Sequence, residues 1–299
     1  MKIAAISDIH IREDGSDDNL VEAIHTRVEE ISPDIFVIAG DISEKIDHFS
    51  EILSRLYIPG CENLYVAGNH DIWFEEDKNL GSLEKYAKSI GAACADNGFI
   101  HLPDTPHIHG KTAFVGSIGW SDYSFRREDL DITEEVYQSK QYGNAVWRDL
   151  YCIDWMFTDK EATEIMNEKL EHDLKTLNSN IEQVVFVSHH LPFRDLTLYK
   201  DYLPWDFFSA FMGAVSTGEI LLRDGRVILS ISGHSHIRNQ IRVEDTMAIT
   251  VPLGYGRPPS SEIPEFIKQA VAVIDIDGSD IELTHLVEGD ICEGMQYPH

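Results

Sequence analysis

The sequence predicts a layered α/β fold, in which helices pack against a sheet that contains parallel strands. Short apolar runs rich in Ile, Val and Phe recur along the chain, and Gly, Asp, Asn or Ser residues bound each of them. Helical patterns lie between the early runs, so strand and helix alternate. Such alternation is typical of crossover connections between strands. The runs that we interpret as buried strands are 2–7, 34–40, 63–68, 113–118, 183–188 and 226–232.

The first helix is predicted between the first two strands. From Leu20 to Ile31, apolar residues stand at positions 20, 21, 24, 28 and 31, which is the spacing of one helical face. Ser32 and Pro33 follow directly, and a proline in this place ends a helix. We therefore expect a helix that ends at Ile31.

The segment of about 119–180 interrupts the alternation of strands and helices. It has few β-branched runs, many charges and many aromatic residues, and we interpret it as a helical insertion. Its latter half, from Asp159 to Asn178, has a Glu-rich helical pattern that ends at Asn178-Ser179-Asn180. The aromatic side chains could form a lid that stacks on a base, although an aromatic stripe more often belongs to a hydrophobic core.

The C-terminal part is predicted to contain a rigid loop and a hairpin. Prolines at 252, 258, 259 and 264 follow Val251, and two strands near 270–276 and 281–287 flank Asp277-Gly278, which is a hairpin turn signal. Large α/β sandwiches often form one unit. We therefore expect a single catalytic domain over residues 1–299, with the insertion of about 119–180 as a lid.

Composition and charge exclude several classes of protein. The net charge is −28, so duplex nucleic acid would be repelled unless a basic groove or bound metals supplied positive charge, and no basic run is visible. No segment approaches the ~18 consecutive apolar residues of a membrane span. The apolar run after Met1 is too short for a signal peptide. We expect a soluble cytoplasmic protein that acts on neither membranes nor nucleic acid; its oligomeric state stays open.

The cysteines argue against a zinc ribbon and against a disulfide framework. The chain has four of them, without any C-x-x-C spacing, at Cys61, Cys94, Cys152 and Cys292. We expect these thiols to be buried and reduced, so the chemistry must come from other residues.

Five polar clusters each follow a predicted strand. Because ligands of α/β sheets bind at the carboxyl ends of strands, we expect the five clusters to converge on one site. In Asp8-x-His10 and His234-x-His236, residues two apart in an extended chain face the same side, so each pair can point into one cavity. The clusters are Asp8-Ile9-His10, Gly40-Asp41, Gly68-Asn69-His70-Asp71, His189-His190 and Gly233-His234-Ser235-His236.

Each cluster alone has an ordinary explanation. An aspartate after a strand is more often a turn residue or a helix cap, and a single histidine more often lies in the core or on the surface. Together, two aspartates, one asparagine and four histidines provide oxygen and nitrogen donors that suit Zn, Mn or Fe, without any thiolate. The joint pattern therefore predicts a metal site, and the glycines at 40, 68 and 233 leave room for close approach of the backbone.

These residues match, in order, the motifs of the calcineurin-like metallophosphoesterase superfamily: D-x-H, G-D, G-N-H-[DE], a lone H and G-H-x-H. The match spans residues 8 to 236, and the chain resembles a bacterial member. The resemblance implies a four-layer α/β/β/α sandwich of two mixed sheets flanked by helices. It also implies two divalent metal ions that share Asp41. One ion would be held by Asp8, His10, Asp41 and His236, and the other by Asp41, Asn69, His189 and His234.

The resemblance further implies a hydrolytic mechanism. Two divalent ions would bind the phosphate ester, and a hydroxide that bridges them would attack phosphorus. His70 is the implied catalytic group, because it lies next to Asn69 but is absent from the ligand set. Asp71 is expected either to orient His70 and raise its pKa or to act as a turn residue. His190 would point away from His189 in an extended chain, which favours a structural role.

The motifs also limit the classes of phosphate ester that we expect as substrates. Protein phosphatases of this superfamily carry G-D-x-x-D-R-G and an arginine shortly after G-N-H-E, whereas this chain has Gly40-Asp41-Ile42-Ser43-Glu44-Lys45 and no arginine directly after Gly68-Asn69-His70-Asp71. Nucleases need a basic track, which the charge disfavours. Small phosphodiesters are therefore favoured over small phosphomonoesters. The alternatives are a phosphatase of phosphoproteins, a nuclease, a metallohydrolase of another bond, or a non-catalytic metal-binding scaffold with this fold.

Overall fold

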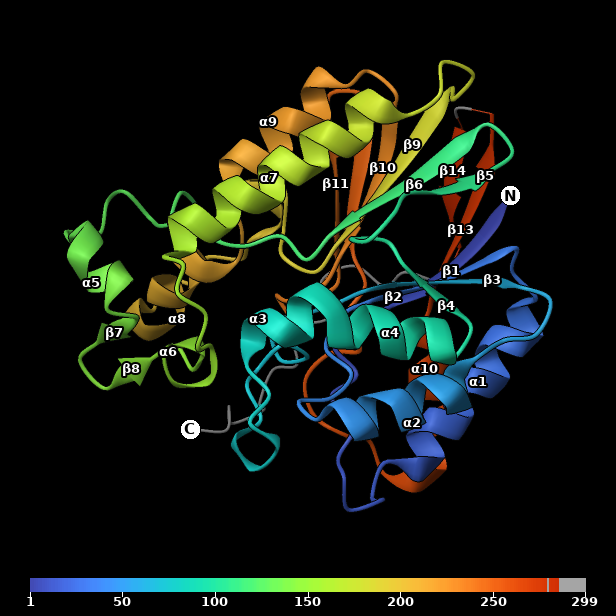
Figure 1. The fold of residues 1–299 in the computed structure, drawn as a ribbon, viewed down its shortest axis with the longest axis horizontal. Helices are drawn as coiled ribbons and strands as arrows, with labels where there is room; N and C mark the ends of the chain where they lie inside the picture. The colour runs from blue at the N-terminus through green and yellow to red at the C-terminus, as the bar shows by residue number, and fades with distance from the viewer. Residues whose placement is uncertain (279, 285–299) are drawn as a thin grey trace.

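The computed structural model describes residues 1–278 and 280–284 and consists of two six-stranded sheets that lie face to face. Figure 1 shows these sheets between two outer groups of helices. Both sheets are mixed, because each combines parallel central strands with antiparallel edge strands. The structure confirms the predicted α/β fold and its four-layer α/β/β/α arrangement.

The first sheet has the strand order β14-β13-β1-β2-β3-β4. Strands β1 to β4 are parallel, and β13 and β14 add an antiparallel hairpin beside β1. The strands predicted at 2–7, 34–40 and 63–68 are β1 to β3, while residues 285–287 of the last predicted strand lie outside the described residues. The bounds are β1 Lys2–Ile6, β2 Ile35–Ala39, β3 Glu62–Val66, β4 Phe99–His101, β13 Ala272–Asp277 and β14 Asp280–Leu283.

The second sheet has the strand order β11-β12-β10-β9-β6-β5. Its four central strands are parallel, and β5 and β11 pair in antiparallel fashion at the two edges. The strands predicted at 113–118, 183–188 and 226–232 are β6, β9 and β10. The bounds are β5 His107–His109, β6 Thr112–Ser117, β9 Gln183–Ser188, β10 Val227–Ser232, β11 Asn239–Val243 and β12 Thr246–Thr250.

Strand residues alternate between two hydrophobic cores. In β2, Ile35 and Val37 lie between the two sheets, whereas Phe36 and Ile38 pack under the helices on the outer face. Both faces are therefore buried, which explains why the strands appear as continuous apolar runs rather than as alternating patterns. Each such side chain stabilises the fold by about 1.5–3 kcal/mol relative to exposure.

Helices cover the outer face of each sheet. The predicted first helix is α1, which buries Leu20, Val21, Ile24, Val28 and Ile31 and ends where Ser32 adopts a left-handed conformation. The helices over the first sheet are α1 Asp18–Ile31, α2 Ile46–Leu56, α4 Ile90–Asp96 and α10 Ile263–Ala270, and the short α3 Ser82–Glu84 precedes α4. The helices over the second sheet are α7 Asp159–Thr176 and α9 Val215–Arg223. Among the described residues, no helix has both the length and the apolar character that crossing a membrane requires.

The segment of about 119–180 divides into two parts. Helix α7 begins with a capping box between Thr158 and Glu161 and belongs to the outer layer over the second sheet. The part before it and residues 203–211 together form a small lobe, seen on the left in Figure 1, around the buried side chains of Tyr123, Tyr137 and Phe207. The lobe contains α5 Glu134–Gln138, β7 Gln141–Tyr142, β8 Ala145–Val146, α6 Asp149–Cys152 and α8 Leu203–Phe208.

Candidate metal centre

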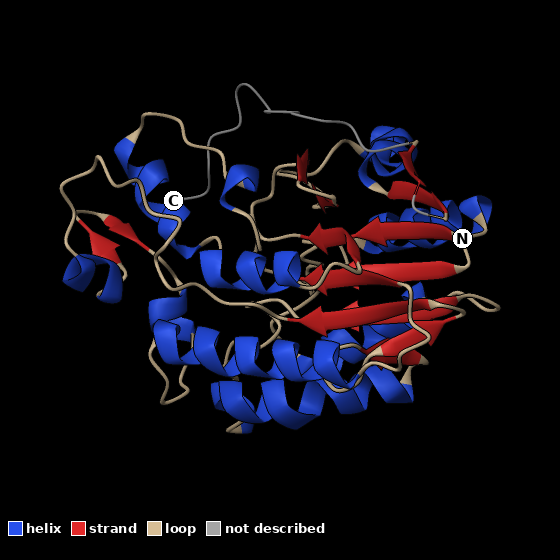
Figure 2. Cartoon of the chain, turned by 90° about the horizontal axis from the view of Figure 1, so that it is seen from above, coloured by secondary structure: helices blue, strands red, loops and turns tan. Residues whose placement is uncertain are grey.

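The predicted ligands gather at the carboxyl ends of strands from both sheets. In Figure 2 the arrowheads of the parallel strands point toward the side of the molecule that carries the lobe. The first sheet contributes the residues after β1, β2 and β3, and the second sheet those after β9 and β10. In chain order these residues are Asp8, His10, Asp41, Asn69, His189, His234 and His236.

Five of these seven residues have a positive φ angle: Asp8, His10, Asp41, His234 and His236, with φ between 41° and 66°. This left-handed conformation costs a residue with a Cβ atom roughly 1–2 kcal/mol. Such strain is concentrated at functional sites, where the surrounding structure enforces it. The predicted extended geometry of the two D-x-H and H-x-H pairs is therefore wrong, because both pairs reach the site through tight left-handed turns.

All three predicted glycines are required by close contacts with the candidate ligands, since a Cβ atom on Gly40 would lie 2.6 Å from His189 Nδ1. A Cβ atom on Gly68 would lie 2.1 Å from Asp41 Oδ1, and one on Gly233 would lie 2.5 Å from Asp8 Oδ2. Real Cβ contacts essentially never fall below 3.0 Å. Any side chain at one of the three positions would therefore displace a candidate ligand.

The first group of donor atoms comes from Asp8, His10, Asp41 and His236, and these atoms all lie within 4.8 Å of one another. Nε2 of His10 lies 3.3 Å from Nε2 of His236 and 3.5 Å from Asp41 Oδ2, while Nε2 of His236 lies 3.4 Å from Asp8 Oδ1. Burial, with the nearby His70, holds the pKa of His10 well below its usual value, and burial also lowers the pKa of His236. Neutral imidazoles beside carboxylates fit a divalent cation, because metal binding needs the unprotonated ring.

The second group of donor atoms centres on His189. Its Nε2 atom lies 3.2 Å from Asp41 Oδ2, 3.2 Å from Asn69 Oδ1 and 3.1 Å from His234 Nδ1. Asp41 therefore stands between the two groups and contacts a histidine of each. Four donors of nitrogen and oxygen type meet here as well, which fits a second divalent cation.

Hydrogen bonds outside the site determine which ring nitrogen faces it. Nδ1 of His189 lies 2.9 Å from the carbonyl oxygen of Ala39, and Nε2 of His234 lies 3.2 Å from that of Phe211. A carbonyl oxygen only accepts, so these nitrogens each carry a proton, and the opposite nitrogen of each ring is the one that faces the site and can bind a metal ion. Histidines that ligate metals in proteins are oriented in the same way.

The electrostatics of the site favour positive charge beside Asp41. Although burial opposes a charged ring, the Asp41 carboxylate raises the pKa of His189 to about 10. In turn, although burial opposes ionisation, His189 holds the pKa of Asp41 well below its usual range. An anionic, 1% exposed carboxylate that attracts a proton to its neighbour would attract a divalent cation by the same force.

His70 lies at the edge of the site and is held on three sides. Its ring stacks on Trp73 at 3.7 Å, its Nδ1 atom lies 3.4 Å from Glu44 Oε1, and its backbone N–H donates to Asp41 Oδ1 at 2.9 Å. Burial opposes the charged ring, but Asp41 and Glu44 together raise the pKa of His70. The carboxylate beside His70 is thus Glu44, which the sequence alone did not single out.

Of the two roles expected for Asp71, the contacts of its side chain fit that of a turn residue and not that of orienting His70. Its buried carboxylate accepts hydrogen bonds from the backbone N–H groups of Asp41, Ile42, Ser43 and Gly68 and from the Tyr65 hydroxyl. These five contacts join the loop after β2 to the loop after β3. Asp71 therefore fixes the position of the Asp41 backbone, and its partners leave no place for His70.

His190 is buried, as a structural role requires. Its Nδ1 atom lies 3.3 Å from the Ile118 carbonyl oxygen, and its ring packs 4.0 Å from that of His234. Burial and the neighbouring His189 lower the pKa of His190 to about 3. This neutral ring supports His234 from behind.

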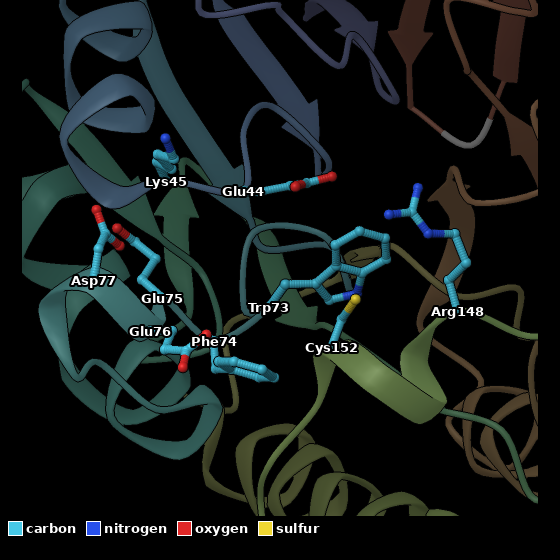
Figure 3. A pocket seen from close by; sticks show the side chains of 9 residues that line it. All are labelled: Glu44, Lys45, Trp73, Phe74, Glu75, Glu76, Asp77, Arg148 and Cys152. Atoms are coloured by element: carbon cyan, nitrogen blue, oxygen red, sulfur yellow. The ribbon is translucent and has the colours of Figure 1, made fainter.

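A cavity of about 520 Å³ opens beside His70. Figure 3 shows Glu75, Glu76 and Asp77 at one end, Arg148 at the other, and Glu44 and Trp73 between them. Glu44 and Trp73 both line the cavity and contact His70, so the cavity adjoins the site. Its lining consists of Glu44, Lys45, Trp73, Phe74, Glu75, Glu76, Asp77, Arg148 and Cys152.

Comparisons with known proteins identify the family of the chain. A model of the calcineurin-like phosphoesterase family matches residues 1–238. The acyl-carrier-protein phosphodiesterase PptH of Mycobacterium tuberculosis is 24% identical over 270 residues, which are 85% of this chain and 78% of that protein. The UPF0046 protein K07C11.7 of Caenorhabditis elegans is 25% identical over 130 residues, and the match spans 42% of this chain and 39% of that protein.

Two solved structures share the fold. The crystal structure of phosphopantetheinyl hydrolase PptH from Mycobacterium tuberculosis has a TM-score of 0.71 at 20% identity, with 95% of each chain covered. A dimetal phosphatase from Danio rerio has a TM-score of 0.56 at 16% identity, with 96% of this chain and 97% of that chain covered. Since the family model matches most of its length, the chain belongs to the calcineurin-like phosphoesterase family, a family of phosphate-ester hydrolases.

Proposed function

We propose that the protein hydrolyses a small phosphodiester with the help of two divalent metal ions. One ion is held by Asp8, His10, Asp41 and His236, and the other by Asp41, Asn69, His189 and His234. The observation that carries this proposal is the meeting of two donor groups at Asp41, whose Oδ2 atom lies 3.5 Å from His10 Nε2 and 3.2 Å from His189 Nε2. When bound, such a pair of Mn, Fe or Zn ions polarises the phosphoryl group and acidifies a water molecule for in-line attack.

His70 supplies the proton for the leaving oxygen. Its Nδ1 atom faces Glu44, so Nε2 is the nitrogen that remains to donate. Stacking on Trp73 fixes the plane of the ring, and the Glu44 carboxylate beside Nδ1 favours its protonated form. His70 therefore acts as a general acid that belongs to neither metal group.

The cavity beside His70 supports a diester with an uncharged or cationic leaving group. Four carboxylates and two cationic side chains line it, and one of the cations, Lys45, pairs with Glu13 at 2.9 Å. This negative lining disfavours a second phosphate or a dianionic monoester. Trp73 and Phe74 add apolar side chains to the lining. The similarity to PptH, which is described as a phosphodiesterase, supports the same preference.

A substrate panel tests the proposal. We expect the protein loaded with Mn²⁺ to hydrolyse bis(p-nitrophenyl) phosphate with a higher kcat/KM than p-nitrophenyl phosphate. It should release little phosphate from a phosphopeptide and leave duplex DNA uncut. A phosphopantetheinyl carrier protein belongs in the panel because of the similarity to PptH. Faster cleavage of the monoester would contradict the diester preference. Two bound ions without turnover of any ester would instead favour the non-catalytic scaffold.

A further inference from the structure

One buried acid of the lobe contacts a candidate ligand directly. Asp149, at the start of α6, is 2% exposed, and its Oδ1 atom accepts a hydrogen bond from Asn69 Nδ2 at 2.9 Å. Two indole N–H groups donate to the same carboxylate, Trp73 Nε1 at 2.7 Å and Trp147 Nε1 at 2.8 Å. Three donors from two distant parts of the chain thus meet on a single side chain.

This hydrogen bond determines which end of the Asn69 side chain faces His189. A carboxylate can only accept, so the group next to Asp149 must be the NH₂ of Asn69. The amide oxygen then points the other way, and Oδ1 lies 3.2 Å from His189 Nε2. If the amide turned over, an NH₂ group without a lone pair would occupy the place of the ligand oxygen.

The same segment also contacts His234. The indole of Trp147 meets the His234 ring edge to face at 5.5 Å and stacks on Phe211 at 5.3 Å. The carbonyl oxygen of Phe211 is the acceptor for His234 Nε2. Two of the four residues in the second donor group, Asn69 and His234, are therefore supported by residues 147–149, which belong to the insertion and not to the sheets.

We propose that Asp149 and Trp147 are positioning residues for the second metal ion, so that docking of the lobe and loading of that ion are coupled. The inference rests on the proposed two-metal site. It gives the lobe a role beyond that of the expected lid, because residues 147–149 contact Asn69 and His234 directly. Any ion that needs Asn69 in this orientation stabilises the docked lobe, since a ligand stabilises the state to which it binds.

Calorimetric titration of the metal-free protein with Mn²⁺ tests this coupling, in the wild type and in Asp149→Ala. Loss of a hydrogen-bond partner behind a metal ligand typically weakens metal affinity about 10- to 100-fold. We expect a loss of this size for the second ion, while the affinity for the first ion, held by Asp8, His10, Asp41 and His236, stays within about twofold of the wild type.

Asp159→Ala is the matched control. Asp159 is also a buried acid next to the lobe and accepts from Trp120 Nε1 at 2.8 Å, Tyr123 hydroxyl at 2.6 Å and Lys140 Nζ at 2.7 Å, but it contacts none of the candidate ligands. It should lower Tm as Asp149→Ala does and leave both metal affinities unchanged. Equal loss of the second ion in the two variants would overturn the inference, because general destabilisation would then explain it.

A conservative variant keeps the test decisive if Asp149→Ala does not fold. Asp149→Asn retains one acceptor oxygen and should weaken the second ion by less than the alanine variant, but by more than Asp159→Asn does. If Asp149→Asn binds the second ion as tightly as the wild type does, the inference is overturned. Binding of two ions by the wild type would still support the proposed site in that case. A wild type that binds fewer than two ions would overturn both.

Discussion

The hydrogen bonds of Asp71 lead to a prediction for the variant Asp71→Asn. In the wild type, Oδ2 accepts from Asp41 N, Gly68 N and the Tyr65 hydroxyl at 2.8, 2.7 and 2.5 Å, and Oδ1 accepts from Ile42 N and Ser43 N at 2.8 and 3.1 Å. An asparagine can keep only one acceptor oxygen. If that oxygen takes the place of Oδ2, the N–H groups of residues 42 and 43 face an amide NH₂ instead.

Two buried donors then lose their acceptor. Each unpaired buried donor costs roughly 1–3 kcal/mol, so the loss is about 2–6 kcal/mol in total. This is a large part of the roughly 5–15 kcal/mol that stabilises a typical domain. We expect Tm to fall by on the order of 10 °C, and turnover to fall with it because the Asp41 loop loses its anchor.

Thermal unfolding followed by circular dichroism measures the effect, with hydrolysis assayed well below the Tm of each variant. Tyr65→Phe is the control, because it removes one hydroxyl donor and leaves four backbone donors on Asp71; it should cost about 1 kcal/mol. An Asp71→Asn protein with unchanged Tm and full activity would refute the role given to Asp71.

The remaining predictions concern the site itself. Asp41→Asn should abolish ester hydrolysis and weaken metal binding, measured by turnover and by elemental analysis, because both donor groups lose their shared carboxylate. His70→Ala should lower kcat by about 10²- to 10⁴-fold while two ions remain bound; full activity in either variant would refute the assignment. Gly68→Ala should reduce metal content through its clash with Asp41, whereas Gly225→Ala, whose Cβ would meet nothing within 4 Å, should not. Equal metal content in the two glycine variants would contradict the close-approach argument.

The strands of the two sheet centres were predictable because both of their faces are buried. Ile35 to Ala39, for example, forms a continuous apolar run in the sequence and is completely buried in β2. Strands β4 and β5 are three residues long, which is too short for a periodic pattern, and β5 is half exposed. Local sequence therefore predicts long central strands better than short edge strands.

Contacts between distant residues explain what the sequence did not reveal about the site. Asp149 lies 80 positions from its partner Asn69 and follows no predicted strand, so no local pattern marks it. Asp71 stands inside a motif, yet three of its five partners come from the distant segment 41–43, and only the fold brings that segment to Asp71. The left-handed conformations of Asp8 and His10 likewise depend on tertiary contacts, since a D-x-H sequence also suits an extended chain.

The aromatic residues of the insertion illustrate the same limit. Trp120, Tyr123 and Tyr137 are at most 3% exposed and belong to hydrophobic cores, as an aromatic stripe more often does. Trp147 is only half buried and contacts the site through Asp149 and His234. Composition alone does not distinguish these four side chains. Only their positions in the fold show that three belong to hydrophobic cores and that Trp147 contacts the site.

Metal-dependent turnover tests the central claim most directly. Metal-free protein is titrated with Mn²⁺ while bound metal and hydrolysis of bis(p-nitrophenyl) phosphate are followed in the same sample. If two metal ions share Asp41, turnover should rise mainly with the second equivalent of metal and reach its plateau at two ions per chain. Full turnover with a single bound ion, or no turnover with two, would contradict the two-metal account.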